Sequence, residues 1–308
     1  MCAIIEKIQK EVPIMSTNEN KGKKAEVTAL QAISAEDRKD WISLAFVQAG
    51  ICVCVPAFLL GALLAEAMPI WPAIISGSLG YLIVVVGMVA TGMIGCDLGL
   101  ASCTCCQAGF GKSGARFIVS TIFAVNMIGW FGIQNGVCGE AFSNAMLAMT
   151  GWDIPVVVSN TIWGIIMLLT AVYGVHALEK LDKISIPLLM IIMCYGTFLA
   201  FKVYGTGNLN DEGTVQSMSF MSGVALSFNF TAVGTITGPD YTRFQKSRKD
   251  TVKSVFYGVF PMGVITLIMG IVLTKLSGQY DISMVLIEVG LPLLGIIALV
   301  ISTWTTNS

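Results

Sequence analysis

Long apolar stretches alternate with short polar connections along most of this chain. The stretches lie at 44–65, 70–94, 117–142, 155–175, 184–201, 218–237, 254–274 and 291–306. Most of them hold about 20 residues, which is enough for an α-helix to cross a hydrocarbon core about 30 Å thick. We therefore expect an all-α polytopic membrane protein, with a polar N-terminal tail over residues 1–40 and one transmembrane domain over residues 41–308 that carries eight spans.

Two of the predicted spans contain residues that interrupt helices. The first carries Gly50 and Pro56, and the sixth carries Gly234 followed by Gly238-Pro239. Backbone groups released at a break find no partner in lipid, so they must face protein or a water-filled cavity. Transporters built from two inverted five-helix repeats interrupt these same two helices and bind substrate and ion between them. The matched pair favours that fold, although glycine and proline are also common in ordinary membrane helices.

The last connection and the last span limit how much of such a fold is present. Residues 279–290 include Asp281 and Glu288 and are too short and too charged to span, so we expect an amphipathic segment at the outer surface. The eighth span follows and reaches Ser308. Because a ten-helix repeat core needs at least two more helices, the chain resembles the first two-thirds of a transporter.

The distribution of basic residues sets the orientation of the spans. Only 12% of the residues are charged, against about a quarter in a soluble domain. Cutting the chain at its apolar stretches places sixteen of the eighteen Lys and Arg residues on one side, leaving Lys202 and Lys275 on the other. Basic connections stay cytoplasmic, so we expect a cytoplasmic N-terminus and a place in the inner membrane. The sixteen are Lys7, Lys10, Lys21, Lys23, Lys24, Arg38, Lys39, Lys112, Arg116, Lys180, Lys183, Arg243, Lys246, Arg248, Lys249 and Lys253.

The nine cysteines do not predict disulfide bonds. Four lie in apolar stretches, where cysteine packs as a small hydrophobic side chain. Cys103, Cys105 and Cys106 cluster in a connection predicted to be cytoplasmic and therefore reducing. The spacing C-x6-C-x-C-C from Cys96 is not that of a zinc site, which leaves metal binding a minor alternative. The sequence contains no nucleophile–base pair, phosphate loop or paired carboxylates, so we expect neither an enzyme nor a bound cofactor.

Polar residues inside two spans are candidates for ligand binding. Asn126, Trp130 and Gln134 share one face of the third span, where an indole beside glycines suits a flat ligand and Gln134 offers a donor and an acceptor. Helix packing through Gly132-x3-Gly136 explains the same pattern and stays open. Three hydroxyls, of Ser302, Thr305 and Thr306, share a face of the eighth span. With carbonyls from a broken helix they suit a hard cation such as sodium, but hydroxyls more often bond back to their own helix.

One further ionisable residue lies near an apolar stretch. Glu140 is the only carboxylate that the pattern places within a run, near the outer end of the third span. An interfacial position is a better interpretation of it than a proton relay.

Several motifs resemble those of the nucleobase–cation symporter family, in particular its cytosine permease branch. They are Gly129-Trp130-Phe131-Gly132, the segment from Gly234 to Phe244, Thr303-Trp304-Thr305-Thr306-Asn307, and the interval from Gly50 to Gly61. The resemblance runs from about residue 40 to the end of the chain. It implies a twelve-helix protein, of which about eight helices are present, that imports a purine, a pyrimidine or a related heterocycle with sodium or protons.

The resemblance also implies roles for individual residues. The carbonyls of Gly50 and Val53 and the hydroxyls of Thr305 and Thr306 would hold the cation, with Ser302 beside it. The substrate would lie between two aromatic rings and meet two amides along its polar edge. The rings are Trp130 and Phe230, and the amides are Asn229 and Asn307.

Two departures from the cytosine permease pattern affect the expected substrate. Gln134 is more similar to the hydantoin-type member, and Ala232 stands where the cytosine branch has a hydroxyl residue. Two other classes therefore stay open: a permease for allantoin, a hydantoin, a vitamin or an amino acid, and a transport-inactive membrane protein. The expected partners are a small heterocycle and the lipid bilayer, without nucleic acid; the sequence does not indicate an oligomeric state.

Overall fold

The computed structural model describes residues 31–307 except 173–174, 207–208, 210–217 and 280–281, and the regular elements of these residues are all helices. The elements are η1 (Ala35–Asp37), α2 (Trp41–Cys52), α3 (Val55–Ala67), α4 (Ile70–Leu98), α5 (Ser102–Cys105), α6 (Gln107–Gly114), the π-helical turn η2 (Ala115–Val119), α7 (Ser120–Thr150), α8 (Val156–Val172), α9 (Val175–Tyr204), α10 (Phe220–Thr231), α11 (Val233–Thr242), α12 (Arg248–Ser277), α13 (Ile282–Glu288) and α14 (Pro292–Asn307).

All eight predicted apolar stretches form helices in this structure. Among the described residues, five helical segments are long and apolar enough to cross a membrane, and the bent pair α2–α3 adds a sixth candidate. The two remaining stretches form α8 and α14, which are apolar but shorter. The expected all-α, multi-pass fold is therefore confirmed. The five long segments are Ile70–Leu98, Gln107–Leu147, Lys180–Tyr204, Phe220–Thr242 and Arg248–Ser277.

The first span is broken as expected, three residues after Gly50. α2 and α3 meet at an angle of 54°. Val53 has φ −92° and ψ 71°, and Cys54 is extended, so the helix stops between them. Pro56 lies in the first turn of α3, where a proline is tolerated because the missing N–H would have no helical partner there.

The sixth span is interrupted much less than the first. Only Ala232 separates α10 from α11, and it keeps helical angles of φ −56° and ψ −30°. Gly238-Pro239 lies within α11 rather than at a break. The glycine serves helix packing instead, because a Cβ at Gly238 would lie 2.7 Å from Oγ1 of Thr91 on α4. The two spans predicted to be broken thus differ in degree.

Residues 31–40 are held against the helical body instead of forming a solvated tail. The guanidinium of Arg38 donates to the carbonyls of Cys96 and Gln245, at 2.9 Å each. The backbone N–H of Lys39 donates to the carbonyl of Phe244 at 2.6 Å. These bonds link the segment to the end of α4 and to the α11–α12 connection. Within the described part of this segment, η1 is the regular element. Residues 1–30 lie outside the described residues.

α9 begins earlier than the apolar pattern indicated. The predicted span was 184–201, whereas the helix runs from Val175 to Tyr204. Lys180 and Lys183, expected in a connection, are therefore exposed on its first turns. Asp182 lies between them and is fully buried. A helix can begin before its apolar stretch, because its backbone hydrogen bonds do not depend on apolar side chains. Hydropathy alone therefore places the start of the helix too late.

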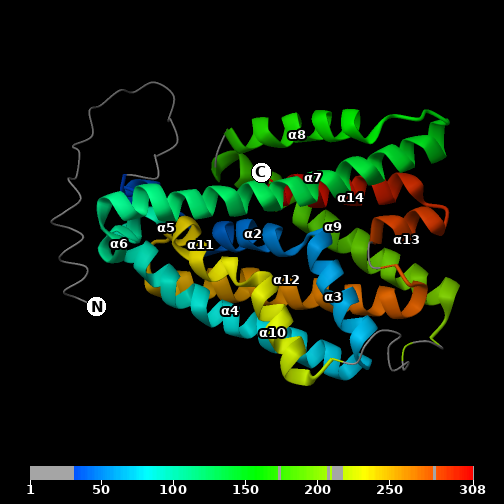
Figure 1. Cartoon of the computed structure of the whole chain (residues 1–308), viewed down its shortest axis with the longest axis horizontal. Coiled ribbons are helices and arrows are strands. Elements are labelled where there is room, and N and C mark those ends of the chain that lie inside the picture. Colours follow the sequence, from blue (N-terminus) through cyan, green and yellow to red (C-terminus); the bar gives the residue numbers. More distant parts are fainter. Residues whose placement is uncertain (1–30, 173–174, 207–208, 210–217, 280–281, 308) are drawn as a thin grey trace.

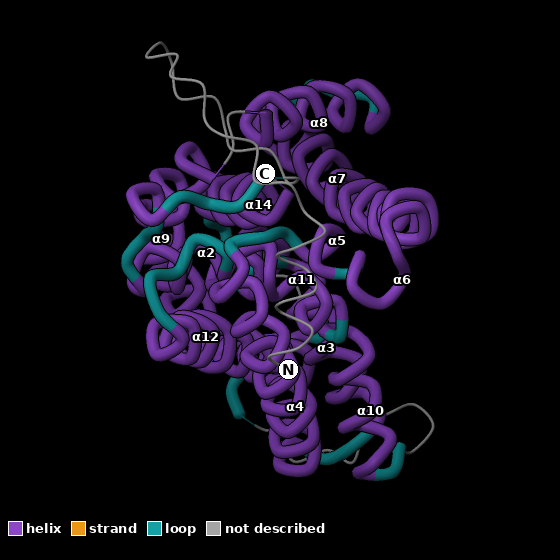
Figure 2. Tube along the Cα trace, turned by 90° about the vertical axis from the view of Figure 1, so that its left-hand side faces the viewer, coloured by secondary structure: helices purple, strands orange, loops and turns teal. Residues whose placement is uncertain are grey.

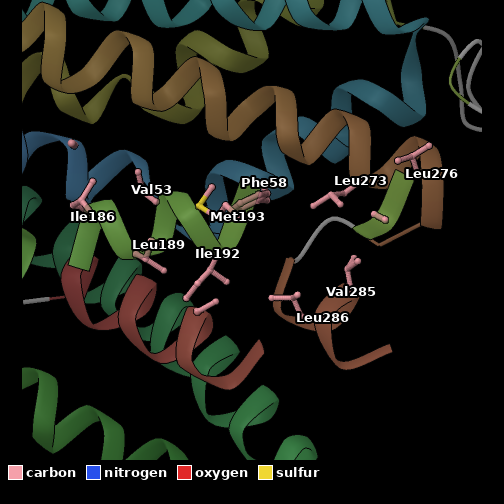
Figure 3. Packing of buried hydrophobic residues seen from close by; sticks show 13 residues of the cluster. Val53, Phe58, Ile186, Leu189, Ile192, Met193, Leu273, Leu276, Val285 and Leu286 are labelled. Atoms are coloured by element: carbon pink, nitrogen blue, oxygen red, sulfur yellow. The ribbon is translucent and has the colours of Figure 1, made fainter. Parts of the chain in front are cut away.

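The helices pack into a bundle with α2 near its centre. Figures 1 and 2 agree that α7 and α8 lie at one side of the bundle and α4 and α10 at the other. A buried apolar cluster joins α9 to the broken first span, α12, α13 and α14. Figure 3 shows this cluster, in which Ile186, Leu189 and Met193 of α9 lie near Val53 of α2. This packing fixes the α2–α3 break between α9 and α14.

Candidate functional site

A cavity of about 890 Å³ lies at the break in the first span. Its walls come from α2, α3, α4, α7, α8, α10, α11, α12 and α14, and most of its lining is apolar. A cavity of this size suits a small-molecule ligand. Four of the five predicted substrate residues line it, namely Trp130, Gln134, Phe230 and Asn307. Asn229 does not, because it is exposed on α10, so the cavity gives no support to a role for it.

Trp130 of α7 and Phe230 of α10 are in direct contact across the cavity wall. Their ring centroids are 5.6 Å apart, and the rings meet edge to face at 74°. A planar ligand stacked between two parallel rings needs a centroid separation of about 7 Å, twice a normal contact distance. The pair therefore leaves no room for a ring between its members in this conformation, and a sandwiched ligand requires the two side chains to move apart.

Gln134 presents an unpaired amide oxygen at the cavity. The residue is 4% exposed, and its Oε1 has no hydrogen-bond partner among the described residues. Buried polar atoms are nearly always paired, so an orphan at a cavity wall marks a position where a ligand would bond. Asn126, which the sequence pattern grouped with Gln134, is not part of the lining.

Gln48 is a lining residue that sequence reasoning missed. It is fully buried on α2, and neither its Oε1 nor its Nε2 has a partner in the described structure. The available signal was an amide in the middle of the first apolar stretch, one turn before the helix break. With Gln134, it provides the cavity with donors and acceptors from two different helices.

A second pair of amides lies where α7 meets α8. The Nδ2 of Asn135 donates to the carbonyl of Asn160 at 3.0 Å. The Oδ1 atoms of both side chains are buried without a partner within the described chain, and both residues line the cavity. Around Gly132 and Gly136, by contrast, a Cβ would meet nothing within 4 Å. The described helices therefore do not use Gly132-x3-Gly136 as a contact face.

The end of α14 is fixed to α7 and α8 through the predicted motif. Asn307 donates from Nδ2 to the carbonyl of Phe131 at 3.3 Å. Trp304 donates from Nε1 to Oγ1 of Thr170 at 2.9 Å. These bonds hold the three hydroxyls of α14 at a defined height beside the cavity.

The predicted cation ligands meet where α2 ends. Thr306 donates from Oγ1 to the carbonyl of Gly50 at 3.3 Å, which joins α14 to α2 across a long sequence separation. Val53 and Thr305 are buried close by, at 0% and 3% exposure. The last four carbonyls of a helix have no intrahelical partner, and the turn of α2 that ends at the break therefore presents oxygens to this space.

The three hydroxyls of α14 also bond back to their own helix. Ser302 donates to the carbonyl of Leu299 at 3.0 Å, Thr305 to that of Ile301 at 3.0 Å, and Thr306 to that of Ser302 at 2.7 Å. Each hydroxyl has a single proton, which Thr306 shares between the carbonyls of Ser302 and Gly50, and the oxygen lone pairs stay available. The arrangement is compatible with cation binding but does not require it.

The cysteine cluster is separate from the cavity. Burial raises the pKa of Cys105 to about 12 and also raises the pKa of Cys103 and of Cys106. The thiols therefore stay protonated at neutral pH. Within the described ranges, no group of three or more His, Cys, Asp or Glu side chains could hold a metal ion. Glu140 is exposed on α7.

Comparisons with known sequences find permeases. A family model described as a permease for cytosine/purines, uracil, thiamine and allantoin matches residues 33–305. The cytosine permease of Escherichia coli strain K12 is 28% identical over 274 residues, which cover 88% of this chain and 63% of that protein. A purine-uracil permease of Arabidopsis thaliana is 25% identical over 303 residues, covering 87% and 49%. The chain thus spans about half to just under two-thirds of the length of these relatives.

Comparisons with solved structures find the same fold. Mhp1, a nucleobase-cation-symport-1 family transporter solved in a closed conformation with bromovinylhydantoin bound, superimposes with a TM-score of 0.81 at 18% identity. The match covers 90% of this chain and 65% of that one. Its inward-facing conformation gives a TM-score of 0.76, with 93% and 66% covered. The predicted transporter fold is confirmed.

Proposed function

This chain belongs to the family of permeases for cytosine/purines, uracil, thiamine and allantoin, and on that premise we propose that it is the larger part of a cation-coupled importer of a planar heterocycle such as cytosine. The proposal places it in the inner membrane with its N-terminus in the cytoplasm. The distribution of basic residues between alternate connections supports this orientation.

One observation carries the proposal: a largely apolar cavity at a helix break is lined by amides with atoms that have no hydrogen-bond partner among the described residues. Gln48 and Gln134 face it from two helices, and the aromatic pair Trp130–Phe230 forms part of its wall. A flat base supplies what this site lacks. Its ring faces match the aromatic surfaces, and its edge carries both donors and acceptors for the amides.

Substrate binding in this proposal separates the two rings. The heterocycle enters between Trp130 and Phe230, exchanges their mutual contact for stacking on each ring, and bonds to Gln48, Gln134 and Asn307 along its edge. Each aromatic contact contributes about 1 kcal/mol. A ring pair that closes around the substrate also separates it from the outer aqueous side.

The cation binds beside this cavity, between the end of α2 and α14. Its proposed ligands are the carbonyls of Gly50 and Val53 and the hydroxyls of Thr305 and Thr306, with Ser302 adjacent. Because α2 contributes to both sites, a cation that holds the end of α2 also fixes the wall that the substrate meets. Each ligand then tightens the binding of the other, as thermodynamic linkage requires.

The test is uptake of radiolabelled cytosine by cells that lack a cytosine permease and express the full gene product, with and without sodium. We expect uptake that Trp130→Ala reduces by at least tenfold. Trp152→Ala is the matched control, because Trp152 is 70% exposed and lies outside the cavity lining, and it should transport normally. Absence of both uptake and cytosine binding, in protein that is correctly inserted, would contradict the cytosine proposal.

A second substrate class is favoured by the same amides. Gln48 and Gln134 both present groups that a cyclic di-carbonyl compound such as a hydantoin or allantoin could pair with. The allantoin permease of Bacillus subtilis is 23% identical over 249 residues, which cover 73% of this chain and 50% of that protein. Competition by unlabelled allantoin and hydantoins that exceeds competition by cytosine would identify this class.

A further inference from the structure

Asp182 is a carboxylate to which the proposed function gives no role. It lies about two turns into α9 and is fully buried. Neither Oδ1 nor Oδ2 has a hydrogen-bond partner among the described residues. A buried carboxylate without hydrogen bonds or an opposite charge is strongly disfavoured, so a compensating positive group is expected next to it.

The carboxylate lies beside Gly50, one of the candidate cation ligands. A Cβ built on Gly50 would lie 3.1 Å from Oδ1, 3.2 Å from Cγ and 3.3 Å from Oδ2 of Asp182. Both oxygens therefore lie close to the side of Gly50 on which a side chain would stand. The carbonyl of the same residue accepts the hydroxyl of Thr306 at 3.3 Å. Three helices, α2, α9 and α14, thus bring a carboxylate, a carbonyl and a hydroxyl to one residue.

The residue type at position 50 fits this arrangement. Distances of 3.1 to 3.3 Å from a Cβ are tighter than ordinary van der Waals contact, so any side chain here would push the carboxylate away. Glycine lets Asp182 approach the end of α2. Val53 and Ile186 pack in the same buried cluster and hold the two helices together at this level (Figure 3).

We propose that Asp182 provides the anionic ligand of the coupling cation. The other proposed ligands, the carbonyls of Gly50 and Val53 and the hydroxyls of α14, are all neutral. A carboxylate gives the site the net charge that a desolvated sodium ion needs, and oxygen donors of this kind are those that hard cations prefer. The inference rests on the proposed function, because the cation site at Gly50 is itself part of that proposal.

The position of Asp182 along α9 indicates its place in the transport path. Gly50 lies about 14 Å from the start of α2, and Asp182 about 10 Å from the start of α9, at 1.5 Å per residue. Both helices start on the side proposed to be cytoplasmic. The carboxylate thus lies on the cytoplasmic side of the break, where it is the last ligand to release a cation that leaves inward.

The experiment measures sodium-dependent stabilisation of the purified full gene product. Thermal unfolding in detergent is followed against sodium chloride, with choline chloride keeping ionic strength constant, for the wild type and Asp182→Asn. We expect the half-saturating sodium concentration to rise at least tenfold in the variant. In choline alone the variant should be as stable as the wild type or more so, since the substitution removes a buried unpaired charge. Asp153→Asn, at an exposed aspartate, is the matched control and should leave the response unchanged.

Two further variants separate the possible failures. Asp182→Ser, also neutral, should show the same weakened sodium response and replaces Asp182→Asn if that variant does not fold. Thr306→Ala tests the cation site independently of Asp182. A weakened response in Thr306→Ala with a normal response in both Asp182 variants would overturn the role of Asp182 and keep the site. A wild type that sodium does not stabilise, while cytosine does, would overturn both this inference and sodium coupling but not substrate binding.

Discussion

The amide of Gln48 is a group whose contribution to binding and to stability should have opposite signs. It is fully buried on α2 and has no hydrogen-bond partner in the described part of the chain, so it is unfavourable in the empty protein and is satisfied only when a ligand binds. The same reasoning applies to Oε1 of Gln134. Polar atoms of this kind mark the ligand cavity more sharply than the aromatic residues do, because aromatic side chains also pack in ordinary cores.

Gln48→Leu should therefore raise the KM for substrate uptake about tenfold while leaving the melting temperature unchanged or higher. Loss of one hydrogen bond to a buried ligand group accounts for about 1.4 kcal/mol, which is a factor of ten. Uptake kinetics and thermal unfolding in detergent measure the two effects. Gln107→Leu, on α6 outside the cavity lining, should leave the KM unchanged. A lower melting temperature with normal KM in Gln48→Leu would mean that the amide has a structural role.

At the scale of elements, the crossing of α3 and α12 depends on two glycines. A Cβ at Gly61 would lie 2.5 Å from the carbonyl oxygen of Leu267, and a Cβ at Gly270 would lie 2.5 Å from that of Phe58. Each glycine thus receives the backbone of the other helix. The half of the broken span that follows the break is held in place by this reciprocal contact.

Gly270→Ala should lower the free energy of unfolding by about 1 to 3 kcal/mol, because backbone atoms cannot move aside for the added methyl group as a side chain could. Reversible unfolding in mixed detergent measures the change. The matched control is Gly136→Ala, where a Cβ would meet nothing within 4 Å, and a glycine-to-alanine change in a helix is then neutral or slightly stabilising. Equal destabilisation by both substitutions would contradict a role for close packing.

How much of the fold the sequence predicts depends on the kind of element. The positions of the spans follow from apolar length alone, and the break after Gly50 follows from the residues around it. The start of α9 does not, because a helix outside the hydrocarbon core needs no apolar residues. Because the predicted start of α9 was too late, Asp182 fell in a connection, where a charged residue is unremarkable. In the sixth span, Gly234 and Gly238 predicted a helix break, but in the structure they mainly allow close packing against α4.

The residues of the candidate site also fall into those that the sequence predicts and those that it does not. Motif resemblance predicted Trp130, Phe230 and Asn307, of which Trp130 and Asn307 occur in recognisable strings, and the polar face of the third span added Gln134. Gln48 lies outside those strings, and its position on the cavity wall depends on which face of α2 turns inward. Nor does a linear sequence show that the two aromatic rings touch in the absence of ligand, since this depends on the spacing of α7 and α10.

At the scale of the whole molecule, the orientation in the membrane is the main prediction. A single cysteine introduced at Lys112 or Lys246, in a background without native cysteines, should react with an impermeant maleimide only from the cytoplasmic side. One at Lys202 should react only from the outside. All three positions are exposed. Labelling of right-side-out and inverted vesicles measures this, and reaction of Lys112→Cys and Lys202→Cys from the same side would contradict the alternation of spans.

The attachment of residues 31–40 has a consequence for the mobility of α2. α2 starts three residues after Arg38, whose guanidinium is bonded to carbonyls at the end of α4 and in the α11–α12 connection. Any swing of α2 away from those two elements must break both bonds. Bonds from a charged donor contribute about 1.5 kcal/mol each at the lower end, so together they favour the attached arrangement about a hundredfold over one in which both are broken. Ten residues outside the cavity lining thereby restrain the helix that forms the first half of the broken span.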